Sequence, residues 1–344
     1  MKKELILHIG TQKTGSSAIQ VFLTQNQKSL LKAGLEYLDP RANKFGLFNM
    51  NHSGLVLALT GFWRNGPPQL SREEAWLMLR EKVEQSRHRV IISSEGFSTP
   101  EVLRHMDFIK ESLSGFDVKV VIYLRRQDIF AQSLYKEQIK DREHRSFALA
   151  YEEAGYKNFL DFKEIVDQWG KAFGKHNIQV RPYERGQLKN GDIVADFMQT
   201  IGVKMNRKML RTDRPVNQTM NKHVLQVSRE LNAIGVNGPR INEFKWWLSS
   251  ILDDDSKSVF VDHDLIGSSR RMEILNEFSD GNRYVAQEYM SRSDGVLFFD
   301  ELPHDTGPIE PDTGIPAKSV AKIISQIFKR SDLLEKFDNS NKNG

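Results

Sequence analysis

The sequence predicts an α/β fold: a doubly wound parallel sheet flanked by helices, followed by a mostly helical C-terminal third. Three observations lead to this prediction. Short apolar runs alternate with amphipathic stretches in the first part of the chain. One run, 118–124 (VKVVIYL), is nearly continuous in β-branched and aromatic residues, as in strands covered on both faces. Beyond about residue 212 only helical periodicity remains.

The N-terminal segment begins with a short buried strand at 4–9 (ELILHI). A glycine-rich turn follows at 10–17, and a helix is expected from about Ser16 until Gly34 ends it. The apolar side chains on one face of this helix are Ile19, Phe22, Leu23, Leu30 and Leu31. A strand, a turn and a helix in this order form the first unit of an α/β sheet.

The next segments continue the alternation. Helices are expected at 51–61 and 71–86, separated by the breaker 64–68 (RNGPP), and a second core strand at 89–93. The segment 98–101 (STPE) is typical of a helix start, with a capping hydroxyl, a proline and an acid. The remaining expected elements are helices at 127–140 and 158–172, a strand at 177–182, and helices at 192–201, 218–233, 239–251, 268–290 and 316–337.

Composition excludes several classes of protein. The chain of 344 residues has no cysteine, which excludes disulfides, thiolate nucleophiles, cysteine zinc sites and iron–sulfur clusters. Lys and Arg total 49 against 45 acidic residues, a net charge of +4 that fits one anionic ligand better than nucleic acid. No apolar stretch approaches the ~20 residues of a membrane span, and the N-terminal run is too short for a signal peptide. We therefore expect a soluble, cytoplasmic protein.

The loop at 10–17 (GTQKTGSS) has the composition of an anion site. Backbone N–H groups and a helix dipole converge where a glycine-rich turn joins a strand to a helix. A nucleotide kinase loop has the pattern GxxxxGK[ST], with lysine directly after the second glycine. Here Ser16 holds that position and Lys13 precedes Gly15. A kinase would also need an acid at the end of a later strand to hold Mg²⁺. Here one later strand ends in Ser93, followed by Ser94 and Glu95, and the other is followed by Arg125.

A second informative segment follows the strand at 118–124. Arg125 stands at the carboxyl end of this strand, where doubly wound sheets bind ligands. Ser133 lies eight residues further on, in the expected helix. An arginine at a strand end and a hydroxyl two helical turns later can hold one phosphate from two sides.

These segments resemble those of PAPS-dependent sulfotransferases, where PAPS is 3′-phosphoadenosine 5′-phosphosulfate. The run 13–17 (KTGSS) is similar to the family's 5′-phosphosulfate loop, with Gln12 where many members have proline. Arg125 and Ser133 match the Arg-x₇-Ser spacing of its 3′-phosphate motif. Weaker likenesses are the segment 183–188 (YERGQL), in which arginine replaces the family's acid, and the segments 282–285 and 297–298, which look like bacterial saccharide or lipopolysaccharide sulfotransferases.

The resemblance implies a role for each matched residue. PAPS would be the donor, and no metal is required. Lys13 would be catalytic by stabilising charge on the leaving phosphate, Arg125 and Ser133 would hold the 3′-phosphate, and Tyr183 would contact the donor. The loop residues implied to bind the 5′-phosphosulfate are Gln12, Lys13, Thr14, Gly15, Ser16 and Ser17. Several families stack the adenine on an aromatic residue where this chain has Ala18.

A general base must take the proton of the acceptor, and family members use histidine or glutamate. His52, at the start of a predicted helix, is the first candidate. Glu95, after the strand at 89–93, is the second, and Glu36 is the third. His8 lies inside the first strand and is expected to be a packed core residue.

The resemblance implies one sulfotransferase domain over 1–338. Its expected parts are a nucleotide-binding core at 1–210 and a helical acceptor or lid portion at 211–338, before a disordered tail at 339–344. The saccharide-like distal segments favour a glycan or glycolipid hydroxyl as the acceptor. Two alternatives stay open: a P-loop kinase or NTPase that binds Mg²⁺-ATP, and a catalytically inactive nucleotide-binding protein.

Overall fold

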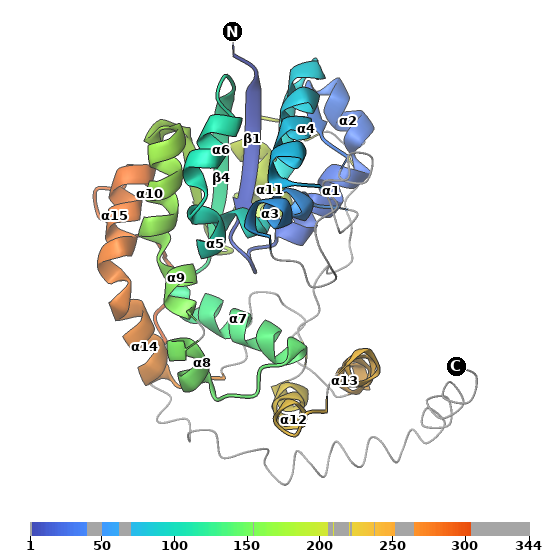
Figure 1. Ribbon diagram of the computed structural model, residues 1–344. Coiled ribbons are helices and arrows are strands. Elements are labelled where there is room, and N and C mark those ends of the chain that lie inside the picture. The colour runs from blue at the N-terminus through green and yellow to red at the C-terminus, as the bar shows by residue number, and fades with distance from the viewer. Residues whose placement is uncertain are drawn as a thin grey trace, which may run out of the picture. The chain divides into compact units, whose positions relative to one another are not determined.

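The computed structural model of the chain (Figure 1) describes residues 2–39, 50–61, 70–153, 155–205, 209, 220, 222–236, 238–251 and 265–303. Backbone packing divides the chain into two compact units that are not consecutive in sequence. Unit 1 comprises Met1–Phe130, Lys157–Val216 and Glu273–Leu302, and unit 2 comprises Ala131–Tyr156, Asn217–Met272 and Pro303–Gly344. The expected single domain over 1–338 stays a prediction.

Unit 1 contains a parallel sheet of five strands within the described residues, in the order β2-β3-β1-β4-β5. The strands are β1 (Glu4–Gly10), β2 (Leu35–Tyr37), β3 (Arg89–Ser93), β4 (Asp117–Leu124) and β5 (Ile178–Pro182). The predicted parallel α/β fold is confirmed. β2 was not predicted, because three residues are too few to show a strand pattern. His8 pairs with Ser93 and Leu124 with Pro182, so the carboxyl ends of the central strands share one edge.

Helices cover both faces of the sheet; α6 and α11, for example, lie on opposite faces (Figure 1). The helices of unit 1 are α1 (Ser16–Gln25), α2 (Gln27–Lys32), α3 (Ser53–Thr60), α4 (Arg72–Gln85), α5 (Pro100–Leu103), α6 (Met106–Ser112), α10 (Phe162–Phe173), α11 (Ile193–Thr200) and α15 (Ser279–Met290). Among the described residues, three helices include residues of both units: α7 (Gln127–Asp141), α9 (Tyr156–Leu160) and α14 (Ser268–Glu277).

The helix predicted over 16–34 is wrong in one respect, because it is broken at Asn26. The backbone N–H and the side-chain amide of Asn26 both donate to the carbonyl of Phe22, at 3.1 and 2.9 Å, and end α1. α2 then starts at Gln27. Leu31, predicted on the buried face, is 39% exposed as a result.

Two other long predicted helices are also broken. Asp161 interrupts the stretch 158–172, since its carboxylate accepts from Glu164 N at 3.0 Å and caps α10. The stretch 268–290 divides into α14 and α15 at Phe278. The helix start at Pro100 is confirmed, but the hydroxyl of Thr99 donates to Gly96 O at 2.9 Å instead of capping the helix.

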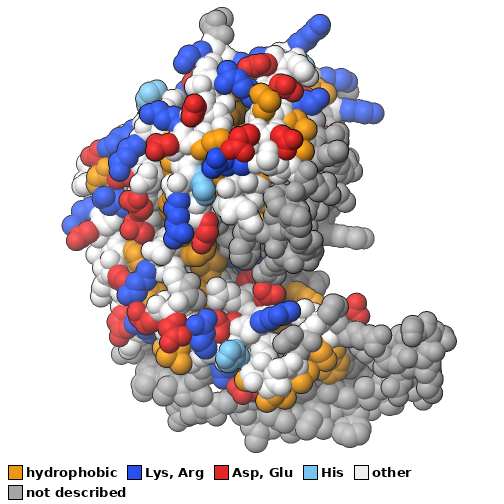
Figure 2. Space-filling model, in the orientation of Figure 1, with side chains coloured by type: hydrophobic (Ala, Val, Ile, Leu, Met, Phe, Trp, Pro, Cys, Tyr) orange, Lys and Arg blue, Asp and Glu red, His pale blue; other side chains and the backbone are white. Residues whose placement is uncertain are grey.

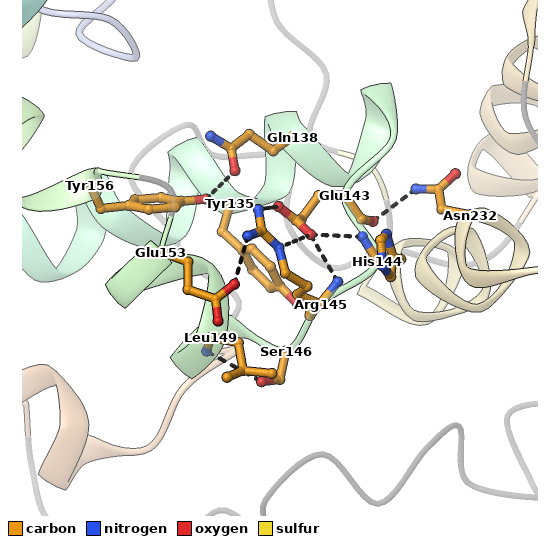
Figure 3. Close-up of polar contacts among 10 residues, drawn as sticks. All are labelled: Tyr135, Gln138, Glu143, His144, Arg145, Ser146, Leu149, Glu153, Tyr156 and Asn232. Atoms are coloured by element: carbon orange, nitrogen blue, oxygen red, sulfur yellow. Dashed lines mark hydrogen bonds and ion pairs between the residues drawn. The ribbon is translucent and has the colours of Figure 1, made fainter. Parts of the chain in front are cut away.

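Unit 2 is helical over its described part. It contains most of α7, together with α8 (Phe147–Glu153), α12 (Lys222–Ala233) and α13 (Pro239–Ile251). α8 was not predicted, and the stretch 316–337 lies outside the described residues. The turn from α7 to α8 is held by Glu143, whose carboxylate accepts from the guanidinium of Arg145 and from two backbone N–H groups (Figure 3).

On the face shown in Figure 2, basic and acidic side chains are interspersed rather than gathered into a stripe of one sign. This mixture matches the small net charge of the sequence. Within the described ranges, no helix combines the length and apolar character needed to cross a bilayer.

Candidate functional site

The loop between β1 and α1 has a backbone that few residues can adopt. Gly10 and Gly15 have φ values of +85° and +80°, in the left-handed region that favours glycine. A Cβ atom on Gly10 would lie 2.8 Å from Cβ of Glu95, so a larger residue is excluded there. Lys13 also has a positive φ, 61°, which is uncommon for a residue with a side chain. The backbone is therefore strained at Lys13, the residue predicted to be catalytic.

Hydrogen bonds fix the loop to the central strands. The backbone N–H and the hydroxyl of Thr11 both donate to Tyr123 O in β4, at 2.7 and 3.1 Å. The hydroxyl of Thr14 donates to Thr11 O at 2.5 Å and closes the turn. Thr11 and Thr14 are buried, so these bonds are shielded from water and hold the loop in one conformation.

The start of α1 offers hydrogen-bond donors to a ligand. Gly15 precedes the helix and provides no side-chain cap. In the described part of the chain, the backbone N–H groups of Ser16 and Ser17 have no hydrogen-bond acceptor. The first turn of α1 holds no acidic residue. These N–H groups lie at the positive end of the helix dipole, which is suited to a phosphate or sulfate group.

Arg125 brings the second predicted motif to this loop. Its Nη1 donates to Lys13 O at 3.2 Å, so residues separated by 112 positions meet at the carboxyl edge of the sheet. The guanidinium carbon of Arg125 lies 6.0 Å from the ring centre of Tyr183. Tyr183 is buried, and a Cβ atom on Gly15 would lie 3.3 Å from its Cε2. Lys13, Arg125 and Tyr183 are therefore gathered in unit 1.

Ser133 lies on α7, as the spacing predicted, and is buried. It belongs to unit 2, whereas Arg125 belongs to unit 1. Their joint hold on one phosphate stays a prediction from the Arg-x₇-Ser spacing.

His52, the first candidate for the general base, is fully buried, and both of its ring nitrogens meet the backbone. Nδ1 accepts from Ser93 N at 3.1 Å, so Nε2 carries the proton and donates to Leu38 O at 3.0 Å. Burial lowers the pKa of His52 to about 4. The ring thus joins the residue that follows β2 to the last residue of β3.

Glu95 lies at the loop, in the single 3₁₀ turn that follows β3. Its backbone and Cβ pack against Gly10, and its side chain is half-buried. The carboxylate Oε2 accepts from Nε2 of Gln20, on α1, at 2.9 Å. Glu36, the third candidate, accepts from the hydroxyl of Ser86 at 2.5 Å, near the amino end of β3 and away from the loop.

Sequence reasoning missed a second group of residues at the same sheet edge. Arg126 binds Asp128 with two hydrogen bonds, at 2.8 and 3.1 Å, and donates to the carbonyls of Asp300 and Glu301. Glu184 accepts from Phe299 N at 2.7 Å and from Asp300 N at 3.1 Å. Arg126 and Glu184 directly follow Arg125 and Tyr183, and they hold the segment 299–301. More than 100 residues separate Arg126 and Glu184 from that segment, and no local pattern in the sequence indicates such pairs.

No protein-family model matches the chain. An uncharacterised protein of Archaeoglobus fulgidus is 24% identical over 221 residues, which are 62% of this chain and 56% of that protein. The chain thus spans little more than half the length of the curated relative it matches.

Three solved structures with similar folds are sulfotransferases by description. The sulfotransferase from Alicyclobacillus acidocaldarius has a TM-score of 0.41 and 18% identity, over 69% of this chain and 95% of that one. Mouse sulfotransferase SULT7A1 complexed with PAP has a TM-score of 0.38 and 12% identity, over 86% and 87%. The sulfotransferase domain from the curacin biosynthetic pathway has a TM-score of 0.36 and 12% identity, over 81% and 98%. These scores are too low to assign a function, so the proposal below rests on the chain's own residues.

Proposed function

We propose that the chain is a sulfotransferase, which moves a sulfuryl group from PAPS to a hydroxyl of a glycan or glycolipid. The observation that carries this proposal is the contact between the guanidinium of Arg125 and the carbonyl of Lys13. It unites the two donor motifs, which the sequence places far apart, at the carboxyl edge of a parallel sheet. This edge is where α/β folds bind ligands.

The groups gathered there fit an anionic donor. The loop at 10–17 contains lysine, threonine and serine side chains and no carboxylate. Ser16 and Ser17 present backbone N–H groups at the start of α1, and Lys13 and Arg125 add positive charge. We assign the loop, from Gln12 to Ser17, to the 5′-phosphosulfate, Arg125 and Ser133 to the 3′-phosphate, and Tyr183 to the nucleoside.

The lysine position favours sulfuryl transfer over phosphoryl transfer. In a kinase loop the lysine follows the second glycine, where this chain has Ser16. Phosphoryl transfer relies on a metal ion to neutralise a polyphosphate. The sulfuryl group carries less charge, so a lysine and a cradle of N–H groups suffice. Lys13 would stabilise the charge that develops on the leaving phosphate oxygen.

For the general base, the contacts favour Glu95 over His52. Both ring nitrogens of His52 are occupied by backbone groups, and the ring is buried. Glu95 is half-buried beside the first residue of the loop. In the proposed reaction the acceptor oxygen attacks sulfur in line, Glu95 takes the acceptor proton, and the bisphosphate leaves opposite the attacking oxygen.

Transfer of ³⁵S from labelled PAPS to a panel of glycosides and glycolipids tests the proposal. We expect labelled product with wild-type protein, and a loss on the order of a hundredfold or more in Lys13→Ala. Arg104→Ala, which removes an exposed cation between α5 and α6, is the control for net charge and should transfer normally. Phosphorylation of an acceptor from Mg²⁺-ATP, with no use of PAPS, would replace this proposal by the kinase alternative.

A further inference from the structure

A series of hydrogen-bonded polar side chains connects Glu95 to Gln20 on α1, and Gln20 to Ser93 and His8 in the sheet. Gln20, in the second turn of α1, is 3% exposed. Its Nε2 donates to Glu95 Oε2 at 2.9 Å and to Ser93 Oγ at 3.2 Å. Ser93 Oγ lies 2.7 Å from Nδ1 of His8, and both residues are fully buried. Polar groups out of contact with water need hydrogen bonds, so each member of the series constrains the orientation of the next.

The direction of these hydrogen bonds follows from the chemistry of His8. Burial lowers the pKa of His8 to about 3, so its ring is neutral at physiological pH and has one donor and one acceptor. Ser93 Oγ accepts from Gln20, and among the described residues Nδ1 of His8 is the one group in reach that can accept the Ser93 hydroxyl proton, so we assign that proton to the bond with Nδ1. The ring proton then lies on Nε2, which has no hydrogen-bond partner in the described part of the chain.

This arrangement selects one orientation of the Gln20 amide. If the amide group were rotated so that its oxygen and nitrogen exchanged places, its oxygen would face the carboxylate of Glu95. Both groups are acceptors and could form no hydrogen bond. Ser93, directed by His8, accepts from the amide nitrogen and so favours the orientation that presents N–H to Glu95. The contact engages Oε2 of Glu95, and among the described residues no hydrogen bond to Oε1 is found.

We propose that Gln20 is the positioning residue for Glu95, and that Ser93 and His8 set the direction of its amide. This inference rests on the proposed function, in which Glu95 is the general base. During transfer, a bond forms between the acceptor oxygen and sulfur. The sulfur–oxygen bond to phosphate breaks, with its electron pair leaving on the bisphosphate, and the acceptor proton moves to Oε1 of Glu95. Gln20 keeps the carboxylate in place by its contact with Oε2.

Hydrolysis of PAPS, with water as the acceptor, provides a test that needs no knowledge of the natural acceptor. The variants are Gln20→Met, which keeps the side-chain length but removes the donor, Glu95→Gln, and the two combined. Thr24→Val is the matched control, since Thr24 lies one turn further along α1 and donates only to Gln20 O. We expect kcat to fall by about tenfold to a hundredfold in Gln20→Met, with KM within about twofold of wild type.

The double variant separates positioning from a merely structural role. If Gln20 acts through Glu95, the double variant is no slower than Glu95→Gln alone. Ser93→Ala, which leaves the amide but removes the group that orients it, should lose less activity than Gln20→Met. Thr24→Val should match wild type.

Calorimetric binding of 3′-phosphoadenosine 5′-phosphate (PAP), measured on the same variants, tests the donor site separately. If the wild-type protein does not bind PAP, the proposed function itself is wrong. With PAP bound normally, three results would overturn the role of Gln20. The first is hydrolysis by Gln20→Met at the wild-type rate. The second is a loss of activity in the double variant equal to the product of the two single losses. The third is hydrolysis by the wild-type protein that is no faster than hydrolysis in buffer alone.

Discussion

Lys13 combines backbone strain with the catalytic role that we propose for its side chain. Its φ of 61° costs about 1 kcal/mol for a residue with a Cβ atom, and glycine would adopt it freely. The chain nevertheless has lysine here, directly before Thr14 and Gly15, with its carbonyl bound to Arg125. Strain of this kind persists where the surrounding structure imposes it, and it is found most often at functional sites.

Two substitutions at Lys13 separate the backbone from the side chain. We expect Lys13→Gly to be more stable than Lys13→Ala by about 0.5–1 kcal/mol, because glycine relieves the left-handed strain but loses more entropy on folding. Both should lose PAPS turnover equally, since both lack the ammonium group. Urea denaturation and PAP release measure the two effects. Turnover recovered by glycine alone would mean that the backbone, and not the charge, is what matters at this position.

His8 and His52 make the stability of the protein depend on pH. Burial lowers their pKa values from 6.5 to about 3 and about 4. Below about pH 6.5 the two histidines of the unfolded chain bind protons that those of the folded chain do not. The free energy of unfolding is therefore independent of the titration of these two residues above that pH, and it falls as the pH decreases towards 4. Each residue contributes a slope of up to about 1.4 kcal/mol per pH unit in this window.

Denaturation of wild type and His52→Gln between pH 7 and 4 measures this linkage. Glutamine can replace both hydrogen bonds of the ring without titrating. The slope of the unfolding free energy against pH is proportional to the number of protons taken up on unfolding. In the variant this number should be smaller by about one. If the two slopes are equal, His52 is protonated in the folded protein or is not buried as described.

At the scale of elements, the turn between α7 and α8 depends on one carboxylate. The guanidinium of Arg145 first, and then the backbone N–H groups of Arg145 and His144, lower the pKa of Glu143 from 4.5 to about 2 against the opposing effect of burial. Glu143 therefore stabilises unit 2 above about pH 4.5, and this contribution is lost as the pH falls towards 2.

We expect Glu143→Gln to lower the free energy of unfolding by about 1–2 kcal/mol at pH 7, and the difference to vanish near pH 2. Glu153→Gln is the matched control, since Glu153 binds the same arginine from a position 56% exposed to solvent and should change stability by less than about 0.5 kcal/mol. Circular dichroism during urea unfolding measures both variants. Equal effects of the two substitutions would show that the turn does not depend on Glu143.

The elements predicted correctly are those with strong periodicity or composition. β3 and α13 have the predicted bounds, and β1, β4 and β5 differ from them by one residue at one end. Errors arose where a side-chain hydrogen bond decides the geometry. Asn26 breaks the first helix and Asp161 caps the start of α10, although the apolar pattern continues through both positions. Periodicity reports which face is buried, and it carries no information on such local caps.

At the scale of the molecule, the sequence predicted the positions of the loop at 10–17 and of Arg125, because both directly follow strands of the sheet. The parallel sheet then brings Lys13 and Arg125 together without further information. The series of Glu95, Gln20, Ser93 and His8 could not be predicted, because its members lie on four elements and none is unusual by itself. The same holds for the buried pairs of Arg126 and Glu184 with the segment 299–301.

Calorimetric titration with PAP in the presence of EDTA tests the central claim most directly, with Mg²⁺-ATP and the variant Arg125→Ala run beside it. The account predicts micromolar binding of PAP without metal, a large loss of that binding in Arg125→Ala, and weak or no binding of Mg²⁺-ATP. Tight binding of Mg²⁺-ATP with no binding of PAP would contradict the assignment of Lys13 and Arg125 to a phosphosulfate donor.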